Sequence, residues 1–172
     1  MPLWTHIAIV IAFILLMEAV AWVSHRYIMH GWGWDWHKSH HEPRVGAWEK
    51  NDLFGVVFSV PSIALIYVGV WHWTPALSMG LGILGYGLIY LFLHDFLVHR
   101  RIDTGLRPKK GYLARIVQAH RLHHAVEGKE GCVSFGFIFA PSPKRLKKML
   151  AATQAANEAV KMRKATGAGA GS

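Results

Sequence analysis

The sequence predicts an all-α integral membrane protein, a bundle of three transmembrane helices (or four) that carries a histidine-rich cap on one side. Three observations support this fold class. Hydrophobic residues make up 52% of the 172 residues and gather in three long runs. All nineteen lysines and arginines lie outside these runs. Ten of the twelve histidines follow one repeated spacing near the ends of the runs. The length suits a single domain.

The three apolar runs are the expected transmembrane helices. They cover residues 4–23, 53–73 and 76–93. Each approaches the roughly 20 residues that cross the hydrocarbon core of a bilayer. Pro61 and the four glycines of the third run would weaken soluble helices, but closely packed transmembrane helices tolerate them. A bend at Pro61, or a re-entrant segment over residues 133–141, leaves a fourth membrane segment open.

The first run is expected to be a retained span. A cleaved signal peptide is the alternative, but no lysine or arginine precedes Arg26, and no small-residue cleavage site precedes His25. Glu18 interrupts this run. A carboxylic acid is costly in hydrocarbon unless it faces the bundle interior, where it is either protonated or bonded to a neighbouring helix.

The C-terminal part differs in composition from the rest. Residues 142–164 form a basic helical pattern with Leu146, Met149 and Leu150 along one stripe, which suits a helix on the membrane surface or a solvated tail. Residues 167–172 are expected to be disordered. We therefore divide the chain into a membrane domain over residues 1–141 and a basic helix with a disordered tail over residues 142–172.

The positive charges predict the topology. All the lysines and arginines lie in residues 24–52 and 100–172, which three spans place on the same side. By the positive-inside rule that side is cytoplasmic, so the N-terminus is expected outside and the C-terminus inside. The net charge of +9 then reflects topology and anionic lipid rather than a nucleic acid partner.

The histidines repeat a two-part pattern on this cytoplasmic side. The first copy is His25, His30, His37, His40 and His41, and the second is His94, His99, His120, His123 and His124. Each copy ends in a triplet whose i, i+3 and i+4 positions share one helix face. Each begins with an i, i+5 pair that a regular helix separates by about 140°. Such a pair needs a bend, a helix end (Gly31 is a candidate) or two different metals. Because imidazole is the commonest protein ligand of iron, zinc and copper, ten of them suit a pair of metal ions.

Other residues near the histidines could tune a metal centre. Four carboxylates lie within a few residues of a histidine of the pattern: Asp35, Glu42, Asp95 and Glu127. A metal-bound imidazole usually donates its second N–H to a carboxylate or carbonyl oxygen; the alternative role of these acids is a salt bridge to a nearby arginine. Cys132, the only cysteine, suits a reducing compartment and is a minor candidate for a thiolate ligand. His6 and His72 are expected near the opposite membrane surface.

The location of this centre limits its chemistry. Two metals at the membrane surface, beneath an apolar bundle, suit an apolar substrate that stays in the bilayer. Activation of an unactivated C–H bond requires a redox metal and dioxygen, because no amino-acid side chain can perform it. The sequence contains no Gly-rich nucleotide fingerprint, haem-attachment motif or iron–sulfur cysteine set, so we expect no bound haem, flavin or nucleotide. The electrons must then come from a separate protein.

Three segments resemble a known family. They are HRYIMHGWGWDWHKSHHEP (residues 25–43), HDFLVHRR (residues 94–101) and QAHRLHHAVEGKEGCVSFGFIFAP (residues 118–141). They are similar to the bacterial β-carotene hydroxylases, which belong to the membrane fatty-acid-hydroxylase and sterol-desaturase superfamily. The resemblance covers residues 4–141. The histidine spacing alone would identify only the superfamily, whereas the surrounding residues are more specific.

The resemblance implies a non-haem di-iron monooxygenase, in the inner membrane of a bacterium, that hydroxylates carbon 3 of carotenoid β-ionone rings. β-Carotene would become zeaxanthin through β-cryptoxanthin, and canthaxanthin could become astaxanthin. Dioxygen is the expected co-substrate, and ferredoxin with its reductase is the expected electron donor. The resemblance also assigns the ten histidines named above as ligands of two iron ions. Zinc is an alternative occupant after purification, because imidazole accepts both metals.

Three rival hypotheses remain open at this point. A related enzyme on the same scaffold would be a carotenoid ketolase, a desaturase, or a hydroxylase of fatty acids or sterols. A non-enzymatic metal protein, such as a transporter, would need more polar groups deep within its spans. A haem protein would need only two to four histidines and would leave the triplets unexplained.

Overall fold

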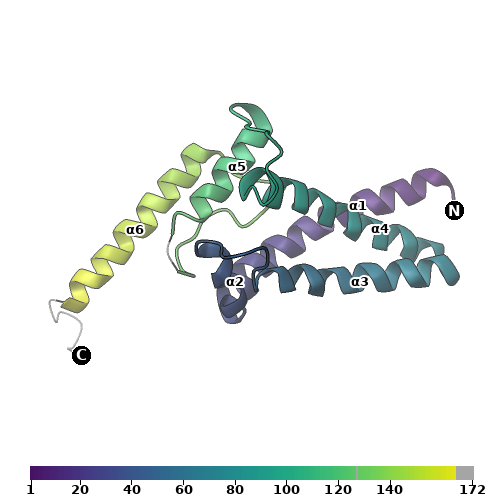
Figure 1. The fold of residues 1–172 in the computed structure, drawn as a ribbon, viewed down its shortest axis with the longest axis horizontal. Coiled ribbons are helices and arrows are strands. Elements are labelled where there is room, and N and C mark those ends of the chain that lie inside the picture. The colour runs from purple at the N-terminus through teal and green to yellow at the C-terminus, as the bar shows by residue number, and fades with distance from the viewer. Residues whose placement is uncertain (127, 166–172) are drawn as a thin grey trace.

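The computed structural model describes residues 1–126 and 128–165, and these form helices joined by irregular segments (Figure 1). The order is α1 (Leu3–Val23), the π-helical η1 (Ser24–Trp32), α2 (Trp34–His41), α3 (Asp52–Trp71), α4 (Thr74–Tyr90), the π-helical η2 (Leu91–Val98), α5 (Gly111–His123) and α6 (Pro143–Ala165). The prediction of an all-α bundle is confirmed.

Three continuous helical stretches are long and apolar enough to cross a membrane. They are Leu3–Trp32, Asp52–Trp71 and Thr74–Val98. The first and third exceed the apolar runs because α1 continues into η1 and α4 continues into η2. No fourth helix among the described residues meets the same requirements. Pro61 lies inside α3 without ending it, and residues 133–141 are irregular.

Helix α4 packs against both α1 and α3, and small residues make the contacts close. A methyl group added at Gly80 would lie 2.7 Å from the Ile66 side chain of α3, and one at Gly82 would lie 2.5 Å from Phe13 of α1. The expected close packing through glycine therefore holds at these two positions. It does not extend to Gly87, where an added methyl group would meet nothing within 4 Å.

One end of the bundle carries His6 and His72, and the other end packs against α5. The N-terminal end of α1 and the C-terminal end of α3, which carry His6 and His72, lie at the end opposite α2 (Figure 1). His6 there shares a hydrogen bond with the Ser78 hydroxyl (Nδ1···Oγ 2.6 Å). At the α2 end, Leu93 and Leu97 of η2 pack against α5, which extends the fold beyond the bundle.

Helix α6 begins against the protein. Leu146 and Leu150 are buried against Ala119 of α5 and Val133, whereas Met149 is largely exposed. The apolar stripe predicted for this segment therefore serves in part to attach α6 to α5. The division of the chain at residue 141 stays a prediction, and residues 167–172 lie outside the described part of the chain.

Candidate metal centre

The ten patterned histidines meet at one end of the bundle, although they come from four helical elements and the residues that follow them. Neighbouring imidazole rings from different elements are in contact. The ring centroids of His25 and His123 are 4.4 Å apart, and those of His41 and His124 are also 4.4 Å apart. His40 and His99 come closest, at 4.1 Å. The fold therefore gathers in one place the two copies of the pattern, which begin 69 residues apart in the sequence, at His25 and His94.

π-Helical backbone explains the i, i+5 pairs. His25 and His30 lie in η1, while His94 lies in η2 and His99 directly follows η2. A π-helix has i→i+5 hydrogen bonds, such as the bond from the His99 N–H to the His94 carbonyl (2.9 Å), and so places residues five apart near the same face. Neither pair needs two different metals. Gly31, expected as a helix end, is instead a kink within η1, with φ −109° and ψ −120°.

The imidazoles form two clusters of four that could each hold a metal ion. The first cluster is His25, His30, His37 and His123, and the second cluster is His40, His94, His99 and His120. Within each cluster the candidate ligand atoms lie within 4.8 Å of one another. His41 and His124 lie between the clusters, since the ring of His41 is near His123 (5.1 Å) and that of His124 is near His120 (4.7 Å).

Six of the imidazoles have a defined tautomer. Their Nδ1 atoms lie 2.7–3.0 Å from oxygen atoms that can only accept hydrogen bonds. The pairs are His25 with the Phe135 carbonyl, His30 with the Lys129 carbonyl, His37 with the Asn51 amide oxygen, His40 with the Glu49 carboxylate, His94 with the Asp95 carboxylate and His123 with the Val133 carbonyl. Each of these Nδ1 atoms therefore carries the proton, and each Nε2 atom of a neutral ring presents a lone pair.

These Nε2 atoms face one another. The Nε2···Nε2 distances are 3.1 Å for His25–His37, 3.0 Å for His30–His123 and 2.9 Å for His40–His94. Two lone pairs so close repel each other unless a cation lies between or beside them. Two nitrogens bound at right angles to one metal, each about 2.1 Å away, would lie about 3.0 Å apart. The donor set therefore fits a metal site with imidazole ligands.

A second proton on the imidazoles does not supply this positive charge near pH 7. Burial lowers the pKa of four imidazoles to about 3: His37, His41, His99 and His124. Burial, followed by the charge of neighbouring imidazoles, holds the pKa of His40, His120 and His123 well below its usual value. These rings are thus neutral near pH 7, which is the form that binds metals.

The four carboxylates selected from the sequence lie in different surroundings. Asp95 lies against His94, as a tautomer-orienting acid would. Glu42 instead pairs with Lys38 (3.3 Å) on the exposed side of α2, and Asp35 is exposed in the first turn of α2. Glu127 lies outside the described residues.

Two orienting residues were missed by the sequence analysis. Glu49 and Asn51 contact the imidazoles of His40 and His37, and both belong to the connection between α2 and α3. They lie eight and ten positions after the histidine triplet, so spacing along the chain did not indicate them. For Glu49 the available signal was the scarcity of acidic residues in the sequence, whereas nothing in the sequence pointed to Asn51.

Arg101 pairs with three carboxylates next to the second cluster. Its guanidinium lies 3.0 Å from Glu49, 2.7 Å from Asp52 and 3.8 Å from Asp95. Because Glu49 and Asp95 each contact an imidazole of the second cluster, this one cation offsets part of the negative charge next to that cluster. Arg101 thus ties the start of α3 to the end of η2.

Cys132 lies near His41 and His123, which makes it a candidate for a third group of ligands. Its thiol points to the Gly128 carbonyl (3.7 Å), and burial raises the pKa of Cys132 to about 11. The protonated thiol is therefore favoured over the thiolate, and thiolate is the form that binds metals.

The known proteins that this chain is similar to are named as hydroxylases. Residues 10–142 match the fatty acid hydroxylase family. A β-carotene hydroxylase of Pantoea ananas is 52% identical over 86% of this chain and 85% of its own length. A β-carotene hydroxylase of Paracoccus sp. (strain PC1) is 54% identical, over 85% of this chain and 91% of its own length. A chloroplastic β-carotene 3-hydroxylase of Haematococcus lacustris is 39% identical over 80% of this chain. No solved structure matches significantly.

Proposed function

Because this chain belongs to the fatty acid hydroxylase family, we propose that it is a membrane monooxygenase that hydroxylates carbon 3 of carotenoid β-ionone rings. β-Carotene would become zeaxanthin through β-cryptoxanthin, and ketolated rings such as those of canthaxanthin would be converted in the same way. The observation that carries the proposal is the set of imidazole lone pairs converging beneath an apolar bundle. The substrate is suggested by the bacterial relatives, which are named as β-carotene hydroxylases.

Two iron ions would be the metals, one in each four-histidine cluster, with His41 and His124 as further ligands beside them. Bound iron supplies the redox chemistry with dioxygen that an unactivated C–H bond requires. One oxygen atom enters the C–H bond and the other leaves as water, which consumes two electrons and two protons for each hydroxyl group formed. Zinc is the alternative occupant after purification, since imidazole accepts both metals.

The protein supplies an apolar wall beside the histidines. The Phe137 ring is stacked on His25 (centroids 5.3 Å apart, planes 11° apart). The Tyr90 ring stacks on His94 at 4.5 Å and contacts Phe137 at 4.7 Å. Phe135 packs edge-on against His25 at 5.4 Å. These rings limit the access of water to the nitrogen atoms and present an apolar surface to a hydrocarbon substrate.

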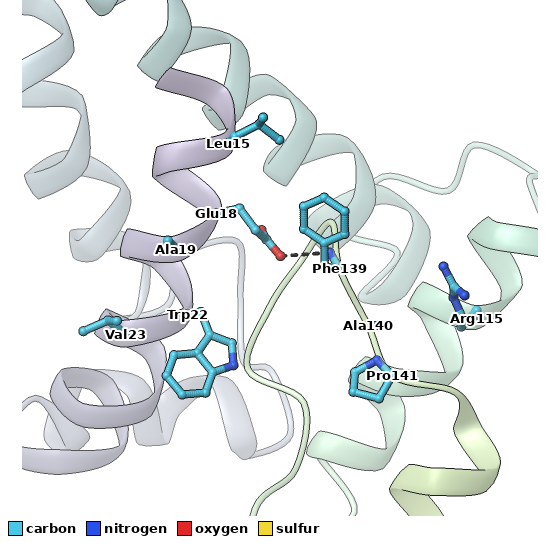
Figure 2. A pocket seen from close by; sticks show the side chains of 9 residues that line it. All are labelled: Leu15, Glu18, Ala19, Trp22, Val23, Arg115, Phe139, Ala140 and Pro141. Atoms are coloured by element: carbon cyan, nitrogen blue, oxygen red, sulfur yellow. Dashed lines mark hydrogen bonds between the residues drawn. The ribbon is translucent and has the colours of Figure 1, made fainter. Parts of the chain in front are cut away.

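We propose that the substrate ring approaches through a groove of about 700 Å³ that lies between α1 and the segment after α5. Figure 2 shows Glu18 and Trp22 of α1 on one side of this groove and Phe139 and Pro141 on the other. The Trp22 ring is 6.3 Å from Phe135, which in turn contacts His25. One aromatic layer thus separates the groove from the first cluster.

Narrowing this groove should slow hydroxylation without removing metal. Ala19 is exposed on its wall, so Ala19→Trp should lower the turnover of β-carotene by at least about tenfold. Val57→Trp is the matched control, because Val57 lines a second apolar groove of about 470 Å³ beside α3. Turnover in isolated membranes, normalised to metal content, measures both. If Val57→Trp slows turnover and Ala19→Trp does not, the ring enters by the second groove.

The proposal also specifies the electron donor and the orientation of the protein in the membrane. A reduced ferredoxin, regenerated by its reductase, would deliver the electrons, in agreement with the lack of a nucleotide or haem motif in the sequence. The histidines, the basic segments and the C-terminus would face the cytoplasm of a bacterium, with the N-terminus on the outer side of the inner membrane.

Pigment analysis tests the proposal. Bacterial cells that accumulate β-carotene and express this chain should form first β-cryptoxanthin and then zeaxanthin, in an oxygen-dependent manner. Unchanged β-carotene, despite membrane-inserted and metal-loaded protein, would contradict the assigned substrate. Ketolated carotenoids, fatty acids and sterols would then be tested in the same membranes.

A further inference from the structure

Glu18 is a buried carboxylate in the largely apolar helix α1. Its Oε1 atom accepts hydrogen bonds from the backbone N–H groups of Phe137, Ile138 and Phe139, at 3.0, 3.0 and 2.9 Å. Its Oε2 atom accepts a hydrogen bond from the Tyr86 hydroxyl of α4 at 2.8 Å. Figure 2 shows the carboxylate directed at the backbone of Phe139. One side chain of the first span therefore holds three consecutive N–H groups of the segment that follows α5.

That same segment orients the first cluster. The Phe135 carbonyl accepts the Nδ1–H of His25, and the Val133 carbonyl accepts that of His123. Phe135 is only two residues before the first N–H group that Glu18 binds. The position of the two carbonyls, and with it the direction of the two imidazoles, therefore depends on a segment that Glu18 fixes to the bundle.

The second cluster depends on other partners. His40 and His94 donate to the carboxylates of Glu49 and Asp95, which Arg101 holds in place. Neither acid belongs to the segment that Glu18 binds. The Nδ1–H partners of the two clusters therefore differ: backbone carbonyls and the Asn51 amide oxygen in the first cluster, and carboxylates in the second.

We propose that Glu18 is a positioning residue for one metal only, the metal of the first cluster. It acts by accepting hydrogen bonds from the backbone N–H groups of residues 137–139, which belong to the segment that orients His25 and His123. This inference rests on the proposed di-metal function. A buried acid in a transmembrane helix is costly unless it has a specific partner, and here all four contacts are donors that converge on the carboxylate oxygens. An apolar residue at this position would fill the space in α1 but would leave the segment without an acceptor.

The segment is shaped to receive the carboxylate. A methyl group added at Gly136 would lie 2.6 Å from the Glu18 Oε1 atom and 2.8 Å from the Phe139 carbonyl oxygen. A side chain at residue 136 would therefore push the segment and the carboxylate apart. Gly136→Ala thus tests the contact from the other partner, with Glu18 itself unchanged.

The experiment is a metal count on the purified full-length chain in detergent, after removal of metal and titration with Co²⁺. Glu18→Leu should bind about half as much Co²⁺ as the wild type at a Co²⁺ concentration just sufficient to fill both wild-type sites. Loss of the partners that orient metal-bound imidazoles typically lowers metal affinity about 10–100-fold, which would leave the first cluster largely empty at that concentration. Glu18→Gln should bind nearly the full amount, since an amide oxygen can accept the same three N–H bonds. Gly136→Ala should lose the same fraction as Glu18→Leu, or part of it.

Controls separate this effect from general loss of structure. Ser62→Ala removes a buried hydrogen bond of the bundle, to the Gly80 carbonyl (2.9 Å), in a part of the chain that does not touch the segment, and should bind Co²⁺ fully. Hydroxylation alone would not suffice as a readout, because Glu18 also lines the proposed substrate groove. The Co²⁺ absorption spectrum provides a second readout, since loss of one site should remove one component and leave the other.

The possible outcomes are distinct. Full Co²⁺ binding by both Glu18→Leu and Gly136→Ala would overturn the inference and leave the proposed function intact. Equal weakening of both sites in these variants, while they elute as folded protein, would overturn the assignment to one cluster. If Glu18→Leu does not fold, Gly136→Ala decides between these results. Failure of the wild type to bind Co²⁺ at all would overturn the proposed di-metal function itself.

Discussion

Replacement of His123 by alanine should abolish carotenoid hydroxylation while the protein remains in the membrane. His123 is fully buried, its Nδ1–H is donated to the Val133 carbonyl, and its Nε2 atom lies 3.0 Å from that of His30. Alanine removes one nitrogen donor from the first cluster and leaves a cavity next to the proposed metal. Because hydroxylation needs both metals in the proposed function, loss of one cluster should lower product to the background level. Pigment analysis of β-carotene-accumulating cells, with immunodetection of the membrane protein, measures this.

His72→Ala is the matched control. His72 follows α3 at the end of the bundle opposite α2, so its removal should leave hydroxylation near the wild-type level. Wild-type activity in His123→Ala would refute the assignment of the clustered histidines as ligands. Complete loss of activity in His72→Ala, at normal expression, would mean that the topology or the ligand set is wrong.

Glu49→Gln should release metal from the second cluster. The Glu49 carboxylate accepts the Nδ1–H of His40 at 2.9 Å and pairs with Arg101 at 3.0 Å. A neutral amide keeps the shape but removes the negative charge that makes the imidazole a stronger donor. We expect metal affinity at this cluster to fall about 10–100-fold and hydroxylation to fall with it. Metal retained after dialysis against a graded series of chelator concentrations gives the affinity.

Glu42→Gln provides the comparison for Glu49→Gln. Glu42 directly follows the histidine triplet in the sequence, yet its carboxylate pairs with Lys38 on the exposed side of α2. An exposed i, i+4 pair contributes at most about 0.5 kcal/mol, so this variant should retain metal and activity. Equal effects of the two substitutions would show that contact with the imidazole is not what makes Glu49 important.

In a Glu18→Leu, Glu49→Gln double variant, both metals should be lost.

The sequence determined the membrane architecture by itself. The free energy of transferring a helix into hydrocarbon is roughly the sum of the contributions of its side chains. Residues 53–73 could therefore be identified as a span without knowledge of the helices that pack against them. The gathering of histidines at one end of the bundle followed in the same way, because their distance from the ends of the apolar runs is a local property.

Spacing predicted that the histidines of each triplet share a helix face, but the expectation that they converge on one place was wrong. His37 and His123 belong to the first cluster, whereas His40 and His120 belong to the second. Spacing also did not predict how the i, i+5 pairs come together. The triplets obey the period of the α-helix, which the sequence shows directly. The pairs require π-helical turns at His25–His30 and around His94, and such turns are rare insertions that no composition rule indicates. Here the backbone, and not the pattern, brings the two imidazoles of each pair into one cluster.

The partners of the buried polar groups were decided only by the tertiary structure. Glu49 orients His40, the Phe135 carbonyl orients His25, and Glu18 binds the segment after α5 more than a hundred residues away. A hydrogen bond forms between whichever donor and acceptor the packing brings within about 3 Å, so its partner is not encoded near either residue in the chain. The sequence by itself therefore determined the three spans and the collection of candidate ligands, whereas only the packed fold decided how those ligands are divided, oriented and held.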